Sequence, residues 1–226
     1  MTEKRPCEVV YCDTLAHEHP DNVRFMRDVE AWIGQPITLI RSENYTDIFD
    51  VFDKEKWLVG PKGARCTTEL KKRVRMTYQE PDDIHVFGFT ADEYHRIVRF
   101  RKSNPELYLE WPLLDGNISK ADCLNRLRLA GIAVPVMYRL GYKNNNCIGC
   151  VKGGAGYWNK IRNDFPLAFD RMAKQERKMG VTILRTQRNG IRHQTYLDEL
   201  SPTAGVYSGE PDIECGPQCL LPGIIQ

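Results

Sequence analysis

Hydrophobic residues in the first 131 positions form short apolar runs that alternate with segments of helical spacing. The apolar runs predict strands at residues 9–13, 37–40, 84–89 and 107–109. Helical spacing, capping residues and terminal glycines predict helices over 20–33, around 48–52, from 66, from 91 and over 119–130. Strands that alternate with helices favour a parallel sheet. The expected fold class is therefore α/β, with an open, mostly parallel sheet and helices on both faces.

The pattern changes after residue 150. A glycine-rich loop over 153–156 precedes a predicted basic amphipathic helix at residues 165–179. Residues 182–185 and 191–196 lie on either side of an Asn-Gly turn and predict a hairpin. We expect residues 1–150 to form the α/β domain. Residues 151–226 would then form a basic C-terminal extension with the hairpin and a cysteine-rich tail.

The composition is that of a soluble globular protein, with 42% hydrophobic and 27% charged residues. No apolar run reaches the ~18 residues that suggest a spanning helix, and no signal-like segment follows the polar N-terminus. We therefore expect a cytoplasmic protein with no membrane association. In a reducing compartment, the eight cysteines are expected to be metal ligands, reactive thiols or buried small residues rather than disulfides.

Positive charge is concentrated in two zones. Residues 151–200 contain ten Lys and Arg against five acids, and residues 61–75 contain six against Glu69 alone. Such zones predict a polyanionic partner, which is either a nucleotide phosphate or a nucleic-acid backbone. A solvated helix face explains the second half of the 151–200 zone equally well.

Cysteines with metal-ligand spacing dominate the candidate chemistry. Cys147 and Cys150 form a Cys-x-x-Cys, a spacing at which two thiolates reach one metal. Cys66 stands about 80 residues earlier, and Cys215 and Cys219 form a second pair near the C-terminus. Thiolates hold both iron–sulfur clusters and structural zinc. The five residues therefore predict a metal site, whereas Cys7, Cys12 and Cys123 are expected to be packed among apolar neighbours.

A second group of residues suggests an anion-binding site. Asp13 and Thr14 end the first predicted strand, at the edge of an α/β sheet where ligands bind. Cys66 is expected to enter a helix with a threonine as N-cap, where free N–H groups favour a thiolate or an anion. The glycine at position 88 would let a ligand approach the backbone closely.

The order of several short motifs resembles the phosphoadenosine phosphosulfate (PAPS) reductase-like family, and phage and mobile-element members look closest. The likeness covers most of residues 8–160. Its motifs are Cys12-Asp13-Thr14, Glu18-His19-Pro20, Arg65-Cys66-Thr67 with Leu70-Lys71, Gly88 with Glu93 and Arg96, Glu110-Trp111-Pro112-Leu113, Asp122-Cys123, and Asn145-Asn146-Cys147-Ile148-Gly149-Cys150.

The resemblance implies the fold of the adenine-nucleotide α-hydrolase group, which includes the PP-loop ATP pyrophosphatases. It also implies an adenine nucleotide or sulfonucleotide as substrate or ligand. The residues that would face it are Asp13, Thr14, Arg65, Lys71, Gly88 and Arg96. Iron–sulfur members place cysteines about 80 residues before a Cys-x-x-Cys. A 4Fe–4S cluster on Cys147, Cys150 and two or more of Cys66, Cys215 and Cys219 is therefore expected, with zinc as the alternative.

The C-terminal motif departs from the family pattern. Glu214-Cys215-Gly216 resembles the start of the Glu-Cys-Gly-Leu-His segment whose cysteine attacks the sulfonucleotide, but Pro217-Gln218 replaces Leu-His. Cys215 is accordingly expected to be either the nucleophile or, with Cys219, a metal ligand.

A PP-loop, the Ser-Gly-Gly-x-Asp-Ser-like segment after the family's first strand, does not occur in the sequence. It should precede Val9 by some 25 residues, yet eight residues stand before Val9. The family's first strand is central in the sheet, so its loss would leave the backbone of both neighbours unpaired. Three explanations are open: an incomplete chain start, another chain that supplies the element, or lost nucleotide hydrolysis.

Two classes of function follow. The first is a sulfur or nucleotide enzyme, either a sulfonucleotide reductase or an adenylating sulfurtransferase, with a cysteine-ligated cluster. The second is a catalytically degenerate accessory protein that binds nucleic acid or a protein partner, with a structural metal. A homo-oligomer is compatible with both.

Overall fold

A computed structural model of the chain describes residues 7–60, 63–188 and 191–213. Its strands are β1 (Val9–Cys12), β2 (Ile37–Ile40), β3 (Val59–Gly60), β4 (Gly63–Ala64), β5 (Ile84–Val86), β6 (Tyr108–Glu110), β7 (Leu184–Arg188) and β8 (Ile191–Thr195). Its α-helices are α1 (Asp21–Ile33), α2 (Ile48–Glu55), α3 (Arg65–Thr67), α4 (Arg73–Tyr78), α5 (Tyr94–Ser103), α6 (Pro112–Asp115), α7 (Lys120–Leu129), α8 (Val136–Arg139), α9 (Ala155–Asp164) and α10 (Pro166–Met179).

Most elements lie where the sequence predicts them. Gly34 ends α1 in the left-handed conformation, with φ 75°, and its N–H donates to Glu30. Ser119 and Asp122 form a capping box at the start of α7. The predicted hairpin is β7 paired antiparallel with β8, although its turn at residues 189–190 lies outside the described residues.

Two local expectations were wrong. The helix of Cys66 begins at Arg65, so the cysteine lies in its first turn and the adjacent threonines lie within the helix rather than at its N-cap. This helix continues through a π-helical turn, Thr68–Lys72, into α4. The glycine-rich stretch after Cys150 is not all loop, because α9 starts at Ala155.

The parallel strands form two separate pairs rather than one open sheet. β1 pairs with β2 and β5 pairs with β6, both in parallel, and no further strand joins either pair within the described residues. Parallel sheets are normally covered on both faces. Here Val10, Ile84 and Val86 stay 37%, 50% and 49% exposed. The fold is thus of mixed α/β character with small parallel sheets.

The larger hydrophobic core joins residues from both sides of position 150. Phe52 of α2 and Leu70 lie in one cluster with Trp158 of α9, Phe169 of α10 and Leu197. Phe52, Trp158 and Leu197 are fully buried, and each such side chain contributes about 1.5–3 kcal/mol. A smaller core of Phe89, Ile97, Phe100 and Trp111 lies beneath α5 and β6.

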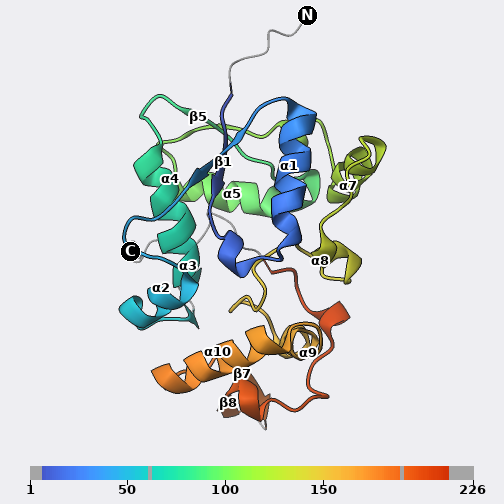
Figure 1. Cartoon of the computed structure of the whole chain (residues 1–226). Helices are drawn as coiled ribbons and strands as arrows, with labels where there is room; N and C mark the ends of the chain where they lie inside the picture. Colours follow the sequence, from blue (N-terminus) through green and yellow to red (C-terminus); the bar gives the residue numbers. More distant parts are fainter. Residues whose placement is uncertain (1–6, 61–62, 189–190, 214–226) are drawn as a thin grey trace, which may run out of the picture.

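The elements form two tiers. Helices α9 and α10 and the hairpin lie in one, whereas β1, α1, α4 and α5 lie in the other (Figure 1). The segment between α8 and α9, which carries the Cys-x-x-Cys, connects the two tiers. The candidate site therefore lies where they meet.

Candidate functional site

The cysteine loop, residues 144–150, is fixed by backbone contacts from both tiers. The Ile148 N–H donates to the His17 carbonyl at 2.7 Å. On the other side, the Tyr157 hydroxyl accepts from the Cys150 N–H at 2.9 Å and donates to the Cys147 carbonyl at 3.3 Å. Cys150 is 9% exposed, whereas Cys147 is half-buried. The backbone around both cysteines is therefore positioned by hydrogen bonds.

Gly149 allows the turn between the two cysteines. Its φ is +75°, in the region that favours glycine. A Cβ at this position would also lie 3.2 Å from the ring of the buried Trp158. The turn is thus packed directly on the main core.

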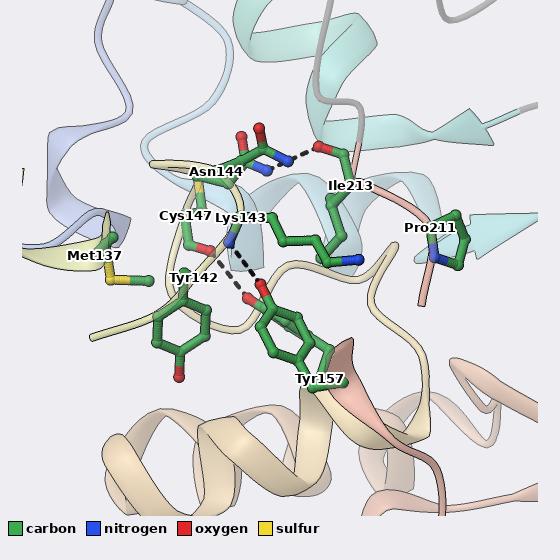
Figure 2. Close-up of a pocket in the computed structure, with 10 residues that line it drawn as sticks. Met137, Tyr142, Lys143, Asn144, Cys147, Tyr157, Pro211 and Ile213 are labelled. Carbon is green, nitrogen blue, oxygen red and sulfur yellow. Dashed lines mark hydrogen bonds between the residues drawn. The ribbon is translucent and has the colours of Figure 1, made fainter. Parts of the chain in front are cut away.

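A small cavity lies beside Cys147. Tyr142, Lys143, Tyr157 and Ile213 contribute to its wall, and its volume of about 10 Å³ suits roughly one water molecule. In Figure 2 the segment of Lys143, Asn144 and Cys147 faces the segment of Pro211 and Ile213. The cavity that the described residues enclose is too small for a nucleotide.

The return segment, residues 201–213, leads the chain back to the cysteine loop. Glu210 caps α9, because its carboxylate accepts from the N–H groups of Gly156 at 2.6 Å and Tyr157 at 3.1 Å. The Lys143 ammonium donates to the Glu210 carbonyl. At the end of the described chain, Asn146 Nδ2 donates to the Ile213 carbonyl at 2.9 Å. The return segment therefore ends beside the residue that precedes Cys147.

Cys66 belongs to the same core as the cysteine loop, since it packs against the cluster that includes Cys150. Among the described residues, no three His, Cys, Asp or Glu side chains form a group arranged to hold a metal. Cys215 and Cys219 lie outside the described residues. The expected ligand set is thus described only at Cys66, Cys147 and Cys150.

Polar side chains converge at the carboxyl end of β1. The Tyr11 hydroxyl donates to Glu18 at 2.6 Å, and Thr14 donates to the same carboxylate at 2.5 Å. Burial is the main reason why the pKa of Tyr11 is raised far above its usual value. The Glu18 carboxylate and Cys147 raise it further, and Lys71 opposes the rise. Lys71 and Cys147 are therefore both within electrostatic reach of Tyr11.

The predicted nucleotide-binding residues are not gathered at one place by contacts. Asp13 pairs with Arg41 at 2.7 Å, and Thr14 is 5% exposed. Arg65 is held by Glu55 at 2.6 Å and Glu69 at 3.0 Å.

The other two expected residues lie near the smaller core. Arg96 pairs with Glu93 and stacks over the Phe89 ring. A Cβ at Gly88 would meet only Leu113, at 3.8 Å, so the space at this glycine is open. Of the expected set, Asp13, Thr14 and Lys71 thus lie at the end of β1.

Many cations of the basic zone at 151–200 form ion pairs or hydrogen bonds within the fold. The contacts are Lys160 with Asp164 at 2.8 Å, Arg162 with the Leu197 and Leu200 carbonyls, Arg171 with Asp47 at 3.3 Å, Arg177 with Asp198 and Glu199, and Lys178 with Asp53 at 2.6 Å. These five cations therefore already have intramolecular partners.

Sequence reasoning missed residues that support the loop from a distance. Tyr157 and Glu210 had no motif to mark them, and their contacts span 7 to 54 positions of the chain. Glu18 was noted within the Glu-His-Pro motif, yet nothing in the sequence indicated that it is buried.

None of the helices in the described ranges is long and apolar enough to cross a membrane. No protein-family model, curated protein or solved structure matches the chain.

Proposed function

We propose that the protein is a PAPS reductase-like enzyme that acts on an adenine sulfonucleotide and carries a cysteine-ligated iron–sulfur cluster. Cys147 and Cys150 would be ligands, together with two or more of Cys66, Cys215 and Cys219. Soft thiolate donors suit such a cluster, and zinc is the alternative for the same donor set. The fold that this proposal requires is the adenine-nucleotide α-hydrolase type, of which β1–β2 and β5–β6 would be parts.

The observation that carries the proposal is the return of the chain to the cysteine loop. Ile213 is bonded to Asn146, next to Cys147. The described part of the chain therefore returns to the cysteine loop two sequence positions before Cys215, and this return supports both the ligand and the nucleophile role proposed for that residue.

The proposed chemistry at Cys215 balances without a bound oxidant. Its thiolate attacks the sulfur of the sulfonucleotide, the bond between sulfur and the phosphate oxygen breaks, and the adenine nucleotide leaves. The sulfonate stays on the cysteine as a thiosulfonate. An external dithiol then attacks the cysteine sulfur, releases sulfite and is itself oxidised to a disulfide.

Lys71 is the cation best placed to assist a ligand at this site. It lies within electrostatic reach of both Tyr11 and Cys12, at the carboxyl end of β1. That end of a parallel strand is where α/β proteins bind their ligands. Arg65 is already neutralised by Glu55 and Glu69, so its proposed role would be to orient α3 rather than to carry free charge.

The accessory, nucleic-acid-binding function receives less support. Binding along a nucleic-acid backbone needs several exposed cations that can release counterions. Arg162, Arg171 and Arg177 instead make hydrogen bonds or ion pairs within the fold. We therefore propose that the polyanion is a nucleotide.

Incubation with adenylyl sulfate under anaerobic conditions is expected to leave a sulfonate on Cys215 and to release adenylate. Intact-mass and peptide-mass spectrometry would locate the adduct, and added dithiothreitol would convert it to free sulfite. Cys215→Ser is expected to abolish the adduct, and Cys123→Ser, on α7, to retain it. Wild-type protein that releases neither adenylate nor sulfite would contradict the reductase assignment.

We also propose that a second polypeptide adds a strand beside the parallel pairs. β1 and β5 each have one hydrogen-bonded neighbour among the described strands. Their exposed aliphatic residues, Val10, Ile84 and Val86, would be covered by an added strand and its following helix. An intermolecular strand would pair with a backbone edge that is left open among the described strands.

Light scattering after size exclusion of the protein from its native source is expected to give a mass that exceeds one chain, with a second polypeptide in the same peak. Val86→Lys places a charge on the exposed sheet face and is expected to release that polypeptide, whereas Val206→Lys, on the return segment, is expected to retain it. A monomer that turns over sulfonucleotide would contradict the proposal of a second chain.

A further inference from the structure

The cysteine loop is tied to α1 by one pair of asparagines. Asn145, two residues before Cys147, donates from Nδ2 to Asn22 Oδ1 at 2.9 Å. Asn22 lies in the first turn of α1 and is 3% exposed. The other polar atom of the Asn145 side chain, Oδ1, is buried and has no hydrogen-bond partner within the described part of the chain. The link to Asn22 therefore anchors this side chain.

A buried carboxylate fixes the orientation of Asn22. Glu18 is 5% exposed, and its Oε2 accepts from Asn22 Nδ2 at 2.7 Å. Because the Nδ2 group donates to Glu18, the Oδ1 atom of Asn22 is turned toward Asn145. Tyr11 and Thr14 donate to the same carboxylate at 2.6 and 2.5 Å, so Glu18 is held from three sides.

The network joins two segments that are far apart in the sequence. Tyr11, Thr14, Glu18 and Asn22 surround the end of β1 and the start of α1, and Asn145 lies 123 positions after Asn22. A second contact between the same segments is the bond from the Ile148 N–H to the His17 carbonyl at 2.7 Å. The cysteine loop is thus fastened at Asn145 and Ile148, on either side of Cys147.

We propose that Asn22 and Asn145, oriented by Glu18, are positioning residues that hold Cys147 and Cys150 in a preformed metal-binding arrangement. This inference rests on the proposed role of these cysteines as ligands. Groups that orient metal ligands without touching the metal typically change affinity by about 10- to 100-fold when they are removed. Their effect comes from the conformational freedom that the loop regains.

The test uses Co²⁺ as the probe, added to the reduced full-length apoprotein and followed by the thiolate-to-cobalt charge-transfer band. Asn145→Ala and Asn22→Ala are each expected to weaken Co²⁺ binding by about tenfold or more. The double variant is expected to bind no more weakly than either single one, because both changes break the same link. Asn125→Ala, on α7, serves as the matched control and is expected to bind as wild type does.

The conservative change separates positioning from general stability. Glu18→Gln can still accept from Asn22 with its carbonyl oxygen, and its amide can donate to Thr14. It is therefore expected to keep Co²⁺ affinity close to wild type, whereas Glu18→Ala is expected to lose it in step with Asn22→Ala. Affinity that falls equally in Glu18→Gln and Glu18→Ala would contradict the orienting role.

Amide hydrogen exchange provides a second measurement that needs no metal. In Asn145→Ala apoprotein, exchange at Ile148 is expected to accelerate, whereas exchange at the buried Trp158 in α9 stays slow. Unchanged exchange at Ile148 together with unchanged Co²⁺ affinity would overturn the proposal. A wild-type protein that binds no Co²⁺ would refute the metal role of the loop, and exchange at Ile148 would still decide whether the asparagines hold it.

Discussion

An anaerobically purified Cys147→Ser variant is expected to contain almost no iron and to lack the brown colour expected of the wild-type protein. Cys147 and Cys150 share one tight turn whose backbone is held by Tyr157 and His17. In the proposed site both sulfurs bind the same metal. A serine hydroxyl stays protonated at neutral pH and is a harder donor than a thiolate. Iron and acid-labile sulfide, measured per protein chain, check this result.

Cys123→Ser is the matched control for this loss. Cys123 lies on α7, and Asp92, Asp122 and Arg126 are the charged groups near it. None of these belongs to the cysteine loop. Iron that falls equally in Cys123→Ser and Cys147→Ser would indicate general damage, and iron that is retained in Cys147→Ser would remove this residue from the ligand set.

Gly156→Ala is expected to destabilise the protein strongly. A Cβ at this position would lie 2.5 Å from the Tyr207 nitrogen and 2.7 Å from the Val206 carbonyl carbon. Because these are backbone atoms, the return segment itself must shift, and overpacking of this kind costs typically about 1–3 kcal/mol. The shift would also weaken the Glu210 cap on α9. Urea unfolding of wild type and variant measures the difference.

Gly209→Ala is the control for the same segment. Nothing lies within 4 Å of a Cβ built at Gly209, so this substitution is expected to change the free energy of unfolding by less than about 0.5 kcal/mol. Equal stability of Gly156→Ala and wild type would show that the return segment does not pack on α9 as described. The metal content of Gly156→Ala is expected to fall as well, since the same segment leads to Ile213 beside Asn146.

Local chemistry explains why much of the fold could be predicted. β1 and β2 are short apolar runs, Gly34 marks the end of α1, and the Ser119–Asp122 capping box marks the start of α7. Each of these signals involves only a few neighbouring residues, so it can be recognised in the sequence alone.

The start of α9 could not be predicted, because its reason lies elsewhere in the chain. Gly153, Gly154 and Gly156 are typical of a loop. Gly156 nevertheless lies in the first turn of α9, since only a residue without a side chain lets Val206 and Tyr207 cross so closely, and Glu210 then satisfies the exposed N–H groups. Contacts between residues about 50 positions apart produce no recognisable pattern within a short stretch of sequence.

At the site, too, local features could be predicted from the sequence, whereas long-range contacts could not. The Cys-x-x-Cys spacing made Cys147 and Cys150 candidates, and the structure shows how the backbone around them is held. The Glu18, Asn22 and Asn145 network could not be foreseen, because its hydrogen bonds depend on how α1 and the cysteine loop meet. The arrangement of parallel strands as two pairs likewise depends on which strands are present to join them.

The central claim is that these cysteines hold an iron–sulfur cluster. The most direct measurement is an absorption spectrum of the anaerobically purified wild-type protein, together with quantified iron, sulfide and zinc. The account predicts a broad band near ~400 nm, with iron and sulfide in similar amounts and little zinc. Zinc alone, or a protein without metal, would contradict the cluster and favour the accessory function with a structural site.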